Sequence, residues 1–257
     1  MKIGILGSGR EGGWWKRFFE SHGHEVIVSD CAETNLSVIN GAEVIIIAVP
    51  MSAIASASSQ VVTHASAGKL IISVCGLMTP VENMFSLAMP EVAFFHRMIG
   101  PQVPNMEGHS MIVNKLRLRK WEGFVDQVIV DTKASVVEST SSDHDRMEGL
   151  TQGLVRIIML AFGHVISEAP LSVTQFKNAP FQGLVAVLAR ILDFGHLLSR
   201  DMVFENPHVS DWIRLLGDAM IEVKGNPEMF EETFAKLSAF LGPEAIKSGS
   251  LTIAQLA

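Results

Sequence analysis

Residues 2–13 read KIGILGSGREGG. An apolar run comes first, glycines spaced as Gly-x-Gly-x-x-Gly follow it, and a helical pattern then begins. In a strand–turn–helix, the first glycine permits a tight turn and the second lets the backbone approach a pyrophosphate, while the third lets helix and strand pack closely. The stretch therefore predicts the first unit of a dinucleotide-binding sheet. The residues expected to contact the cofactor are Gly7, Ser8, Gly9, Arg10, Glu11 and Gly12.

An acidic residue closes the second predicted strand, at residues 25–29. Asp30 lies 18 positions after Gly12, where a carboxylate can accept hydrogen bonds from ribose hydroxyls. A carboxylate there repels a 2′-phosphate, and no Lys or Arg follows Asp30 within the next several residues. The sequence therefore predicts NAD rather than NADP as the cofactor.

Short apolar runs alternate with helical patterns over the first 140 residues. Strands are expected at 2–6, 25–29, 44–48, 70–74, 92–95, 110–113 and 135–138. Several are continuously apolar, as strands buried on both faces of a parallel sheet are. The prediction is an α/β fold with an N-terminal Rossmann-type, doubly wound sheet in residues 1–141. The carboxyl ends of such strands form the ligand crevice, which adds Val49, Pro50 and Ser73 to the expected cofactor contacts.

The remaining residues, 142–257, show helical periodicity without strand patterns. Helices are expected over 142–168, 181–202, 207–223 and 227–241, with a weaker pattern from 243 onward. We therefore predict an all-helical C-terminal domain.

Composition and charge argue against several other classes of protein. The 257 residues carry 20 Lys and Arg against 27 Asp and Glu, a net charge of −7, and the basic cluster at 115–120 is short. Nucleic-acid binding is therefore not expected. The apolar runs 44–51 and 157–166 are shorter than the roughly 20 residues of a membrane span. With no signal peptide and no Cys or His at metal-ligand spacing, we expect a cytoplasmic protein that binds neither membrane nor metal.

A histidine stands directly after the predicted strand 92–95. At the rim of the cofactor crevice, His96 could accept a hydroxyl proton while hydride leaves the same carbon atom. On spacing alone, a structural histidine bonded to backbone is an equally good interpretation.

Three further segments resemble motifs of the prephenate/arogenate dehydrogenase family. Residues 96–102, HRMIGPQ, resemble its His-Pro-Met-Phe-Gly-Pro-Asp signature, and residues 143–154 resemble its Glu-His-Asp…Gln-Ala-Leu element. Residues 206–213 are similar to its Asp-Pro…Ala-Asp-Ile stretch. With the N-terminal glycines, the similarity covers nearly the whole chain in the same order. The chain looks closest to the bacterial forms, here without a chorismate mutase segment.

This resemblance implies NAD-dependent oxidative decarboxylation of prephenate in tyrosine and aromatic amino-acid biosynthesis. Hydride leaves the ring carbon bearing the hydroxyl, His96 accepts the hydroxyl proton, and loss of carbon dioxide gives the aromatic 4-hydroxyphenylpyruvate. The resemblance also implies that the helical domain, residues 142–257, binds the substrate and forms a homodimer. The small-molecule substrate it implies is a cyclohexadienyl dicarboxylate.

The chain departs from the family at several positions expected to contact substrate. Gly76 stands where the family has a serine that assists the substrate hydroxyl, Met78 replaces a lysine, Arg97 a proline and Arg156 a histidine. The planar fork of arginine suits a carboxylate, so arginine can rebuild such a contact. The residues expected to bind substrate are His144, Gln152, Arg156, Arg190, Arg200, Gly76 and Arg97.

These departures leave alternatives open. Arogenate or 4-amino-4-deoxyprephenate could replace prephenate as the substrate. The ring amine of 4-amino-4-deoxyprephenate donates its electron pair without a base, and this substrate would place the enzyme in aminophenylalanine-type secondary metabolism. A β-hydroxyacid or imine reductase shares the predicted plan, but residues 142–168 contain no lysine, which disfavours the hydroxyacid version. A non-catalytic dinucleotide sensor is the remaining interpretation.

Overall fold

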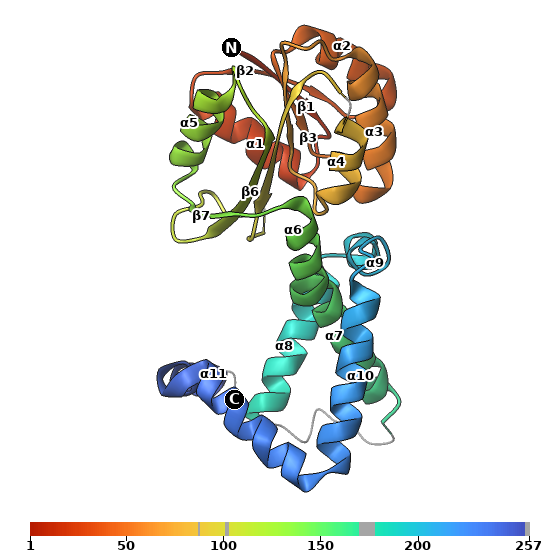
Figure 1. Cartoon of the computed structure of the whole chain (residues 1–257), viewed down its shortest axis with the longest axis vertical. Coiled ribbons are helices and arrows are strands. Elements are labelled where there is room, and N and C mark those ends of the chain that lie inside the picture. Colours follow the sequence, from red (N-terminus) through yellow and green to blue (C-terminus); the bar gives the residue numbers. More distant parts are fainter. Residues whose placement is uncertain (87, 101–102, 170–177, 255–257) are drawn as a thin grey trace. The chain divides into compact units, whose positions relative to one another are not determined.

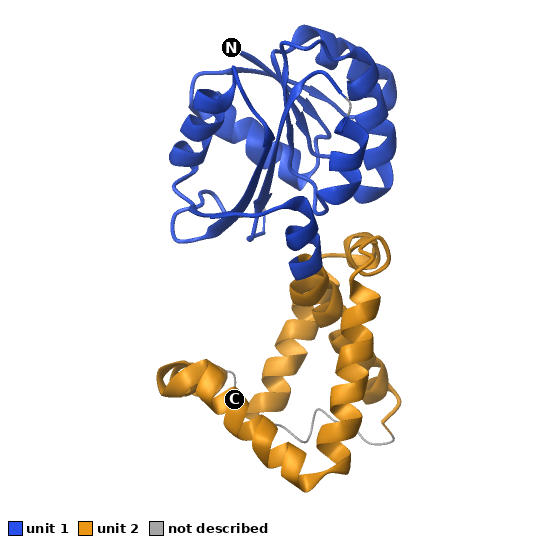
Figure 2. Ribbon diagram, viewed as in Figure 1, with its two compact units in different colours: residues 1–147 blue, residues 148–257 orange. Residues whose placement is uncertain are grey.

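The chain folds into two compact units, residues 1–147 and 148–257 (Figure 2). A computed structural model describes residues 1–86, 88–100, 103–169 and 178–254. The boundary lies six residues after the one expected at 141/142. The difference arises because helix α6 (Ser141–Glu148) begins in unit 1, where His144 and Asp145 hydrogen-bond to residues of the sheet unit.

Unit 1 is built on a seven-stranded sheet with the order β2-β1-β3-β4-β5-β6-β7 (Figure 1). Strands β1 to β5 are parallel, β6 is antiparallel to β5, and β7 is parallel to β6. This confirms the predicted α/β fold, with β5 and β6 longer than expected. The strands are β1 (Lys2–Leu6), β2 (Glu25–Ser29), β3 (Val44–Ile47), β4 (Leu70–Ser73), β5 (Glu91–Arg97), β6 (Ser110–Arg117) and β7 (Ser135–Glu138).

Helices cover both faces of this sheet. Helices α1 (Arg10–Ser21) and α5 (Glu122–Thr132) lie on one face of the sheet (Figure 1). Trp15 and Phe19 of α1 join the buried core there. On the other face, α2 (Ala32–Gly41), α3 (Met51–His64) and α4 (Thr79–Phe85) bury their apolar side chains against the same strands. The order in which strands are added across the sheet reverses at β1, because β2 lies on one side of β1 and β3 on the other. In open α/β sheets, ligands bind outside the carboxyl ends of the strands at such a switch point.

The described part of unit 2 is helical throughout. It contains the π-helix η1 (Gly149–Leu154), α7 (Val155–Ser167), α8 (Ala179–Asp193), α9 (His196–Phe204), α10 (Val209–Gly225) and α11 (Pro227–Ala254). The single helix expected over 181–202 is wrong, because Gly195 adopts a left-handed φ of 87° and separates α8 from α9. Gly242, with φ 75°, bends α11 just before Pro243.

Helices α6, η1 and α7 form one continuous run, Ser141–Ser167. By length and composition this run could cross a membrane, as could α8 and α9 if their 98° bend lay within one span. The sequence predicted a helix over 142–168, but the apolar run within it, 157–166, is shorter than a membrane span. Core helices of soluble proteins meet the same criterion, so the expectation that the chain does not enter a membrane stays a prediction.

Candidate dinucleotide and proton-transfer site

The Gly-rich loop after β1 has the geometry of a phosphate-binding turn. Gly7 has a φ of 104°, and a Cβ atom there would lie 2.4 Å from the Ala48 carbonyl oxygen. A Cβ atom on Gly12 would lie 1.9 Å from the Gly7 carbonyl oxygen, whereas one on Gly9 would meet nothing within 4 Å. Gly7 and Gly12 are therefore required for close packing, and Gly9 leaves open space before the helix.

Helix α1 begins directly after Gly9, and no described side chain caps this end of the helix. The amide groups of a first helical turn have no partners within the helix, and the helix dipole makes this end favourable for anions. Open space above Gly9 and unpaired amides together fit a pyrophosphate. Arg10, the first residue of α1, is exposed beside this end.

Asp30 lies where the sequence placed it, exposed at the carboxyl end of β2. Its Oδ1 accepts a 2.9 Å hydrogen bond from the backbone N–H of Ser8. This bond joins the acidic residue to the Gly-rich loop, so the group expected to bind ribose and the turn expected to bind phosphate are held together.

The other expected cofactor contacts differ in exposure. Val49 is half-buried and Pro50 is exposed at the start of α3, beside the loop that follows β1. Ser73 ends β4 with only 1% of its surface exposed, which disfavours direct contact with a ligand. Gly76 is half-buried in the bend that follows.

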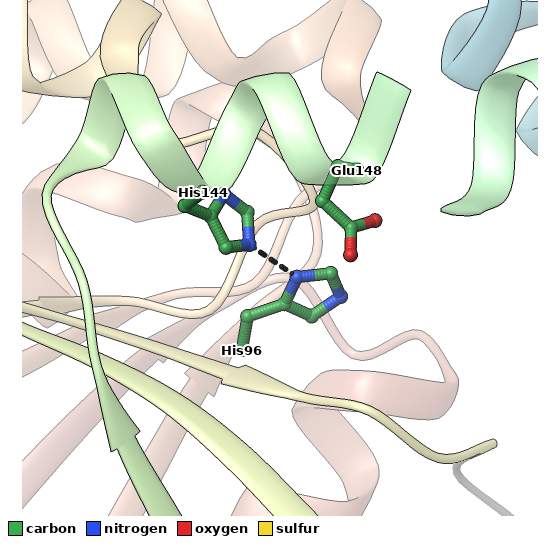
Figure 3. A group of neighbouring side chains, drawn as sticks. All are labelled: His96, His144 and Glu148. Carbon is green, nitrogen blue, oxygen red and sulfur yellow. Dashed lines mark hydrogen bonds between the residues drawn. The ribbon is translucent and has the colours of Figure 1, made fainter. Parts of the chain in front are cut away.

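Two histidines and an aspartate form a hydrogen-bonded chain in unit 1. His96, on β5, and His144, on α6, point their rings at each other, with Nδ1 of His96 2.7 Å from Nε2 of His144 (Figure 3). Nδ1 of His144 lies 2.8 Å from Oδ1 of Asp145. The side chain of His144 is buried, and that of His96 is half-buried. The expectation of no metal stays a prediction, because neighbouring histidines are suitable ligand types.

Asp145 is anchored by backbone groups of the loop that leads into α4. Its Oδ1 accepts a hydrogen bond from the Met78 N–H and its Oδ2 one from the Thr79 N–H, each 2.9 Å long. Burial alone would raise the pKa of Asp145, but the hydrogen bonds from His144, Met78 and Thr79 outweigh it and lower this pKa. The carboxylate is therefore anionic and accepts a hydrogen bond from the Nδ1–H group of His144.

This arrangement determines which ring nitrogens carry protons. Because Asp145 is an acceptor, Nδ1 of His144 donates and its Nε2 accepts in the neutral ring. Nδ1 of His96 must then donate, so the lone pair of the neutral His96 ring is on Nε2. Burial, with the neighbouring His144 and Arg97, lowers the pKa of His96 to about 3, although Asp145 opposes the shift. His96 is therefore neutral at physiological pH and can act as a proton acceptor.

Arg97 follows His96 on β5, and successive side chains of a strand point to opposite faces. Its guanidinium is buried, forms two hydrogen bonds with Glu11 and lies 4.0 Å from the ring centroid of Trp14. Both expected ligand contacts, Arg97 for substrate and Glu11 for cofactor, are thus engaged with each other. This geometry disfavours the substrate contact expected of Arg97.

Unit 2 contains a second polar cluster, on η1 and α7. Arg156 is 5% exposed, and its Nη1 donates to the carbonyl oxygen and the side-chain Oε1 of Gln152, at 3.1 and 3.2 Å. Its buried Nε has no hydrogen-bond partner among the described residues. Burial lowers the pKa of Arg156, and the neighbouring Glu148 partly offsets this shift. A buried guanidinium with a spare donor suits a carboxylate ligand.

The two other arginines expected to bind substrate are more exposed. Arg190, on α8, pairs with Asp193 at 2.9 Å, and its guanidinium lies 4.2 Å from the ring centroid of Phe194. The guanidinium of Arg156 lies 5.6 Å from the same ring, so these two arginines converge. Arg200, on α9, instead pairs with Asp201 at 3.3 Å.

The sequence interpretation missed the role of Asp145. It included this residue only within the motif at 143–154, whereas the carboxylate hydrogen-bonds to His144 and orients it. An acidic residue adjacent to a candidate histidine was the available signal. Pro101 and Gln102, the last residues of the motif that begins at His96, lie outside the described residues.

Fold and site together define a Rossmann-type dinucleotide-binding protein with a helical second unit. Residues 28–76 match the family model described as NADP oxidoreductase coenzyme F420-dependent. Over 241 residues the chain is 22% identical to a curated protein of Methanocaldococcus jannaschii named "Probable arogenate/prephenate dehydrogenase". This alignment includes 82% of the present chain and 53% of that protein, so the chain spans about half the length of its curated relative.

Solved structures share the fold at low identity. Prephenate dehydrogenase from A. aeolicus, in complex with hydroxyphenyl propionate and NAD+, superimposes with a TM-score of 0.74 at 16% identity, covering 98% of each chain. Synechocystis arogenate dehydrogenase gives a TM-score of 0.65 at 14% identity, covering 93% of this chain and all of the other. The resemblance to prephenate/arogenate dehydrogenases is therefore confirmed.

Proposed function

We propose that this chain is a cytoplasmic NAD-dependent dehydrogenase that converts prephenate into 4-hydroxyphenylpyruvate by oxidative decarboxylation, in aromatic amino-acid biosynthesis. One observation carries the proposal: the hydrogen-bonded chain of His96, His144 and Asp145 supplies a neutral, oriented imidazole on the sheet that also carries the dinucleotide-binding loop. The similarity to dehydrogenases of this substrate class supports the same conclusion.

The residues of unit 1 fit NAD. The open space at Gly9 and the free first-turn amides of α1 would hold the pyrophosphate, and Asp30 would accept hydrogen bonds from the ribose hydroxyls. When bound, NAD accepts the hydride. The exposed carboxylate of Asp30 favours NAD over NADP because it would repel a 2′-phosphate.

His96 performs the proton chemistry in this proposal. Its Nε2 accepts the proton of the substrate's ring hydroxyl as hydride leaves the carbon that bears it, and the C–O bond becomes a carbonyl. The bond from the ring to its carboxylate then breaks and carbon dioxide leaves. The electron pair moves through the ring onto the carbonyl oxygen, which takes up a proton as the ring becomes aromatic. His144 and Asp145 keep Nδ1 of His96 protonated, so Nε2 is the nitrogen that receives the proton.

Arginines of unit 2 would hold the substrate carboxylates. Arg156 offers a buried Nε donor, and Gln152 orients its guanidinium. Arg190, near the same Phe194 ring, is the second candidate for a carboxylate contact, and Arg200 is the third.

NADH formation by the purified full chain tests this proposal. It is followed at about 340 nm, where reduced nicotinamide absorbs. NAD and NADP are each tested with prephenate, arogenate and 4-amino-4-deoxyprephenate, and carbon dioxide release is followed in parallel. We expect turnover of prephenate with NAD, and its loss in His96→Asn. His64→Asn, an exposed histidine at the end of α3, serves as the matched control. Binding of NAD without turnover of any cyclohexadienyl substrate would favour the sensor interpretation instead.

A second candidate substrate is 4-amino-4-deoxyprephenate. Gly76 carries no side chain that could assist a ring hydroxyl, and the ring amine of this compound needs no such assistance. If the amine is preferred by the wild-type enzyme, Gly76→Ser should shift preference towards prephenate. Preference for arogenate would leave the reaction unchanged. Only the assignment of the residues that contact the substrate's side chain would then differ.

We also propose that the active form is a homodimer that pairs through unit 2. Helix α11 contains no buried residue over its described length, although Phe230, Phe234, Leu237 and Leu241 form an apolar stripe along it. Such a stripe is energetically unfavourable in water, and a second copy of the chain would cover it.

A further inference from the structure

Arg97 makes a set of contacts that the proposed reaction does not use. Its Nε donates to Oε1 of Glu11 at 2.8 Å, and its Nη2 donates to Oε2 at 2.6 Å. The guanidinium also stacks over Trp14, and its side chain has 0% exposed surface. A paired, two-pronged bond of this kind fixes both position and orientation, so Arg97 holds Glu11 in one place.

Glu11 lies at the end of α1 where the pyrophosphate is expected to bind. It lies in the first turn of α1, two residues after Gly9, and its side chain is 31% exposed. A carboxylate is favourable at a helix N-terminus when nothing is bound there. A bound pyrophosphate would bring negative charge to the same end of the helix, and an unpaired carboxylate would then repel it.

We propose that Arg97 is a positioning residue for dinucleotide binding, which acts by neutralising Glu11 and holding its carboxylate in a fixed place beside the phosphate-binding turn. The inference rests on the proposed function, because it requires a dinucleotide at the Gly-rich loop. It also gives a reason for arginine directly after His96. One strand end presents the proton acceptor on one face of the sheet and the counter-charge of the cofactor loop on the other.

The experiment measures dissociation constants of NAD+, ADP-ribose and adenosine by titration calorimetry. Arg97→Met should weaken NAD+ and ADP-ribose about tenfold, because it exposes the phosphates to an unpaired carboxylate. Adenosine, which has no phosphate, should bind the variant as it binds the wild type. The double variant Arg97→Met with Glu11→Gln should recover NAD+ affinity to within about threefold of the wild type, because it removes both charges.

Further variants separate electrostatics from folding. Glu11→Gln alone should lower the melting temperature, because it leaves the buried Arg97 without its counter-ion. Lys115→Met is the control, since it removes the cation of the Lys115–Asp126 pair elsewhere in unit 1. If Arg97→Met does not fold, Arg97→Lys replaces it, and loss of the paired bond should weaken NAD+ about threefold.

The outcomes distinguish the two levels of the proposal. Failure of the wild-type chain to bind NAD+ or ADP-ribose would overturn the proposed function itself. If the wild type binds, the inference is overturned when Arg97→Met weakens adenosine as much as NAD+, or when Glu11→Gln fails to restore affinity in the double variant. Weaker binding of NAD+ by Glu11→Gln alone would also overturn it, because Glu11 would then be a direct cofactor contact.

Discussion

The imidazole of His96 is kept neutral by its surroundings, and this has a measurable consequence for stability. Its pKa falls from 6.5 to about 3 on folding, chiefly through burial. Between these two values the unfolded chain binds a proton that the folded chain does not. The free energy of unfolding therefore decreases as pH falls from about 6.5 towards 3, since stability rises with pH wherever the unfolded state binds more protons.

We expect His96→Asn to remove this part of the pH dependence. Relative to pH 7, the wild type should lose about 1–2 kcal/mol more than the variant by pH 5. Urea unfolding at both pH values measures the difference. His64→Asn, at an exposed position, should behave like the wild type, and equal pH dependence in His96→Asn would contradict the assigned burial of the ring.

The second prediction concerns Asp145, which orients His144. Asp145→Asn replaces an acceptor with a group that can donate a hydrogen bond. Nδ1 of His144 and Nδ1 of His96 are then no longer held protonated, so the lone pair of His96 is no longer kept on Nε2. We expect kcat to fall on the order of a hundredfold or more, with a smaller change in KM. The control is Asp143→Asn on the same helix, where the carboxylate is exposed and bonds to Thr140. Equal losses of kcat in the two variants would contradict the orienting role.

At the scale of single residues, the sequence predicted where the candidate site residues lie better than it predicted which groups they hydrogen-bond to. His96 could be located because it lies at the end of a buried strand, and Asp30 because its distance from the glycines is fixed by one βαβ unit. The pairing of Arg97 with Glu11 joins residues 86 positions apart and leaves no local pattern. The backbone bonds from Met78 and Thr79 to Asp145 depend on how the start of α4 meets helix α6, which side-chain identity does not encode.

Among the elements, the π-helix η1 depends on glycine for its packing. A Cβ atom on Gly153 would lie 2.3 Å from Cγ2 of Val209, the first residue of α10, and 3.1 Å from the Met202 carbonyl oxygen. We expect Gly153→Ala to destabilise the protein by about 1–3 kcal/mol, because backbone and a β-branched side chain must move. Thermal unfolding should show a melting temperature lower by a few degrees, roughly 2–4 °C per kcal/mol for a chain of this size.

Gly217→Ala provides the matched control within α10. A Cβ atom there meets nothing within 4 Å, so the substitution should stabilise the helix by about 0.5–1 kcal/mol. A destabilised Gly217→Ala, or an unchanged Gly153→Ala, would contradict the close approach of η1 and α10.

The boundaries of the elements show which physical signals are local. All seven strands were predicted near their observed positions. Burial of the parallel strands β1, β3 and β4 imposes continuous apolar runs, whereas the exposed strand β7 was found from its β-branched residues. The break between α8 and α9 was missed because the apolar period continues on both sides of Gly195, whose left-handed φ alone ends the helix. The π-turn within 149–154 was likewise invisible, since a single extra residue per turn hardly disturbs a 3.6-residue pattern.

For the molecule as a whole, the two units bury apolar surface very differently. Unit 1 buries two clusters of aliphatic and aromatic side chains against its sheet. In unit 2, by contrast, α10 and α11 enclose an apolar groove of about 710 Å³ lined by Met220, Val223 and Phe230, and much of their apolar surface is exposed. The sequence predicted the hydrophobic content of this unit, but whether that content is buried within one chain depends on tertiary packing.

The final prediction tests whether a second copy covers this surface. Phe234 is 64% exposed in the middle of the α11 stripe, so Phe234→Glu should place a charge within the proposed interface and shift the protein from dimer to monomer. Sedimentation velocity over a range of micromolar concentrations measures this shift. Ala239→Glu adds the same charge to the opposite side of α11 and should leave the dimer intact. A wild-type monomer, or identical sedimentation of both variants, would contradict pairing through α11, because an apolar stripe that remains solvent-exposed cannot hold two chains together.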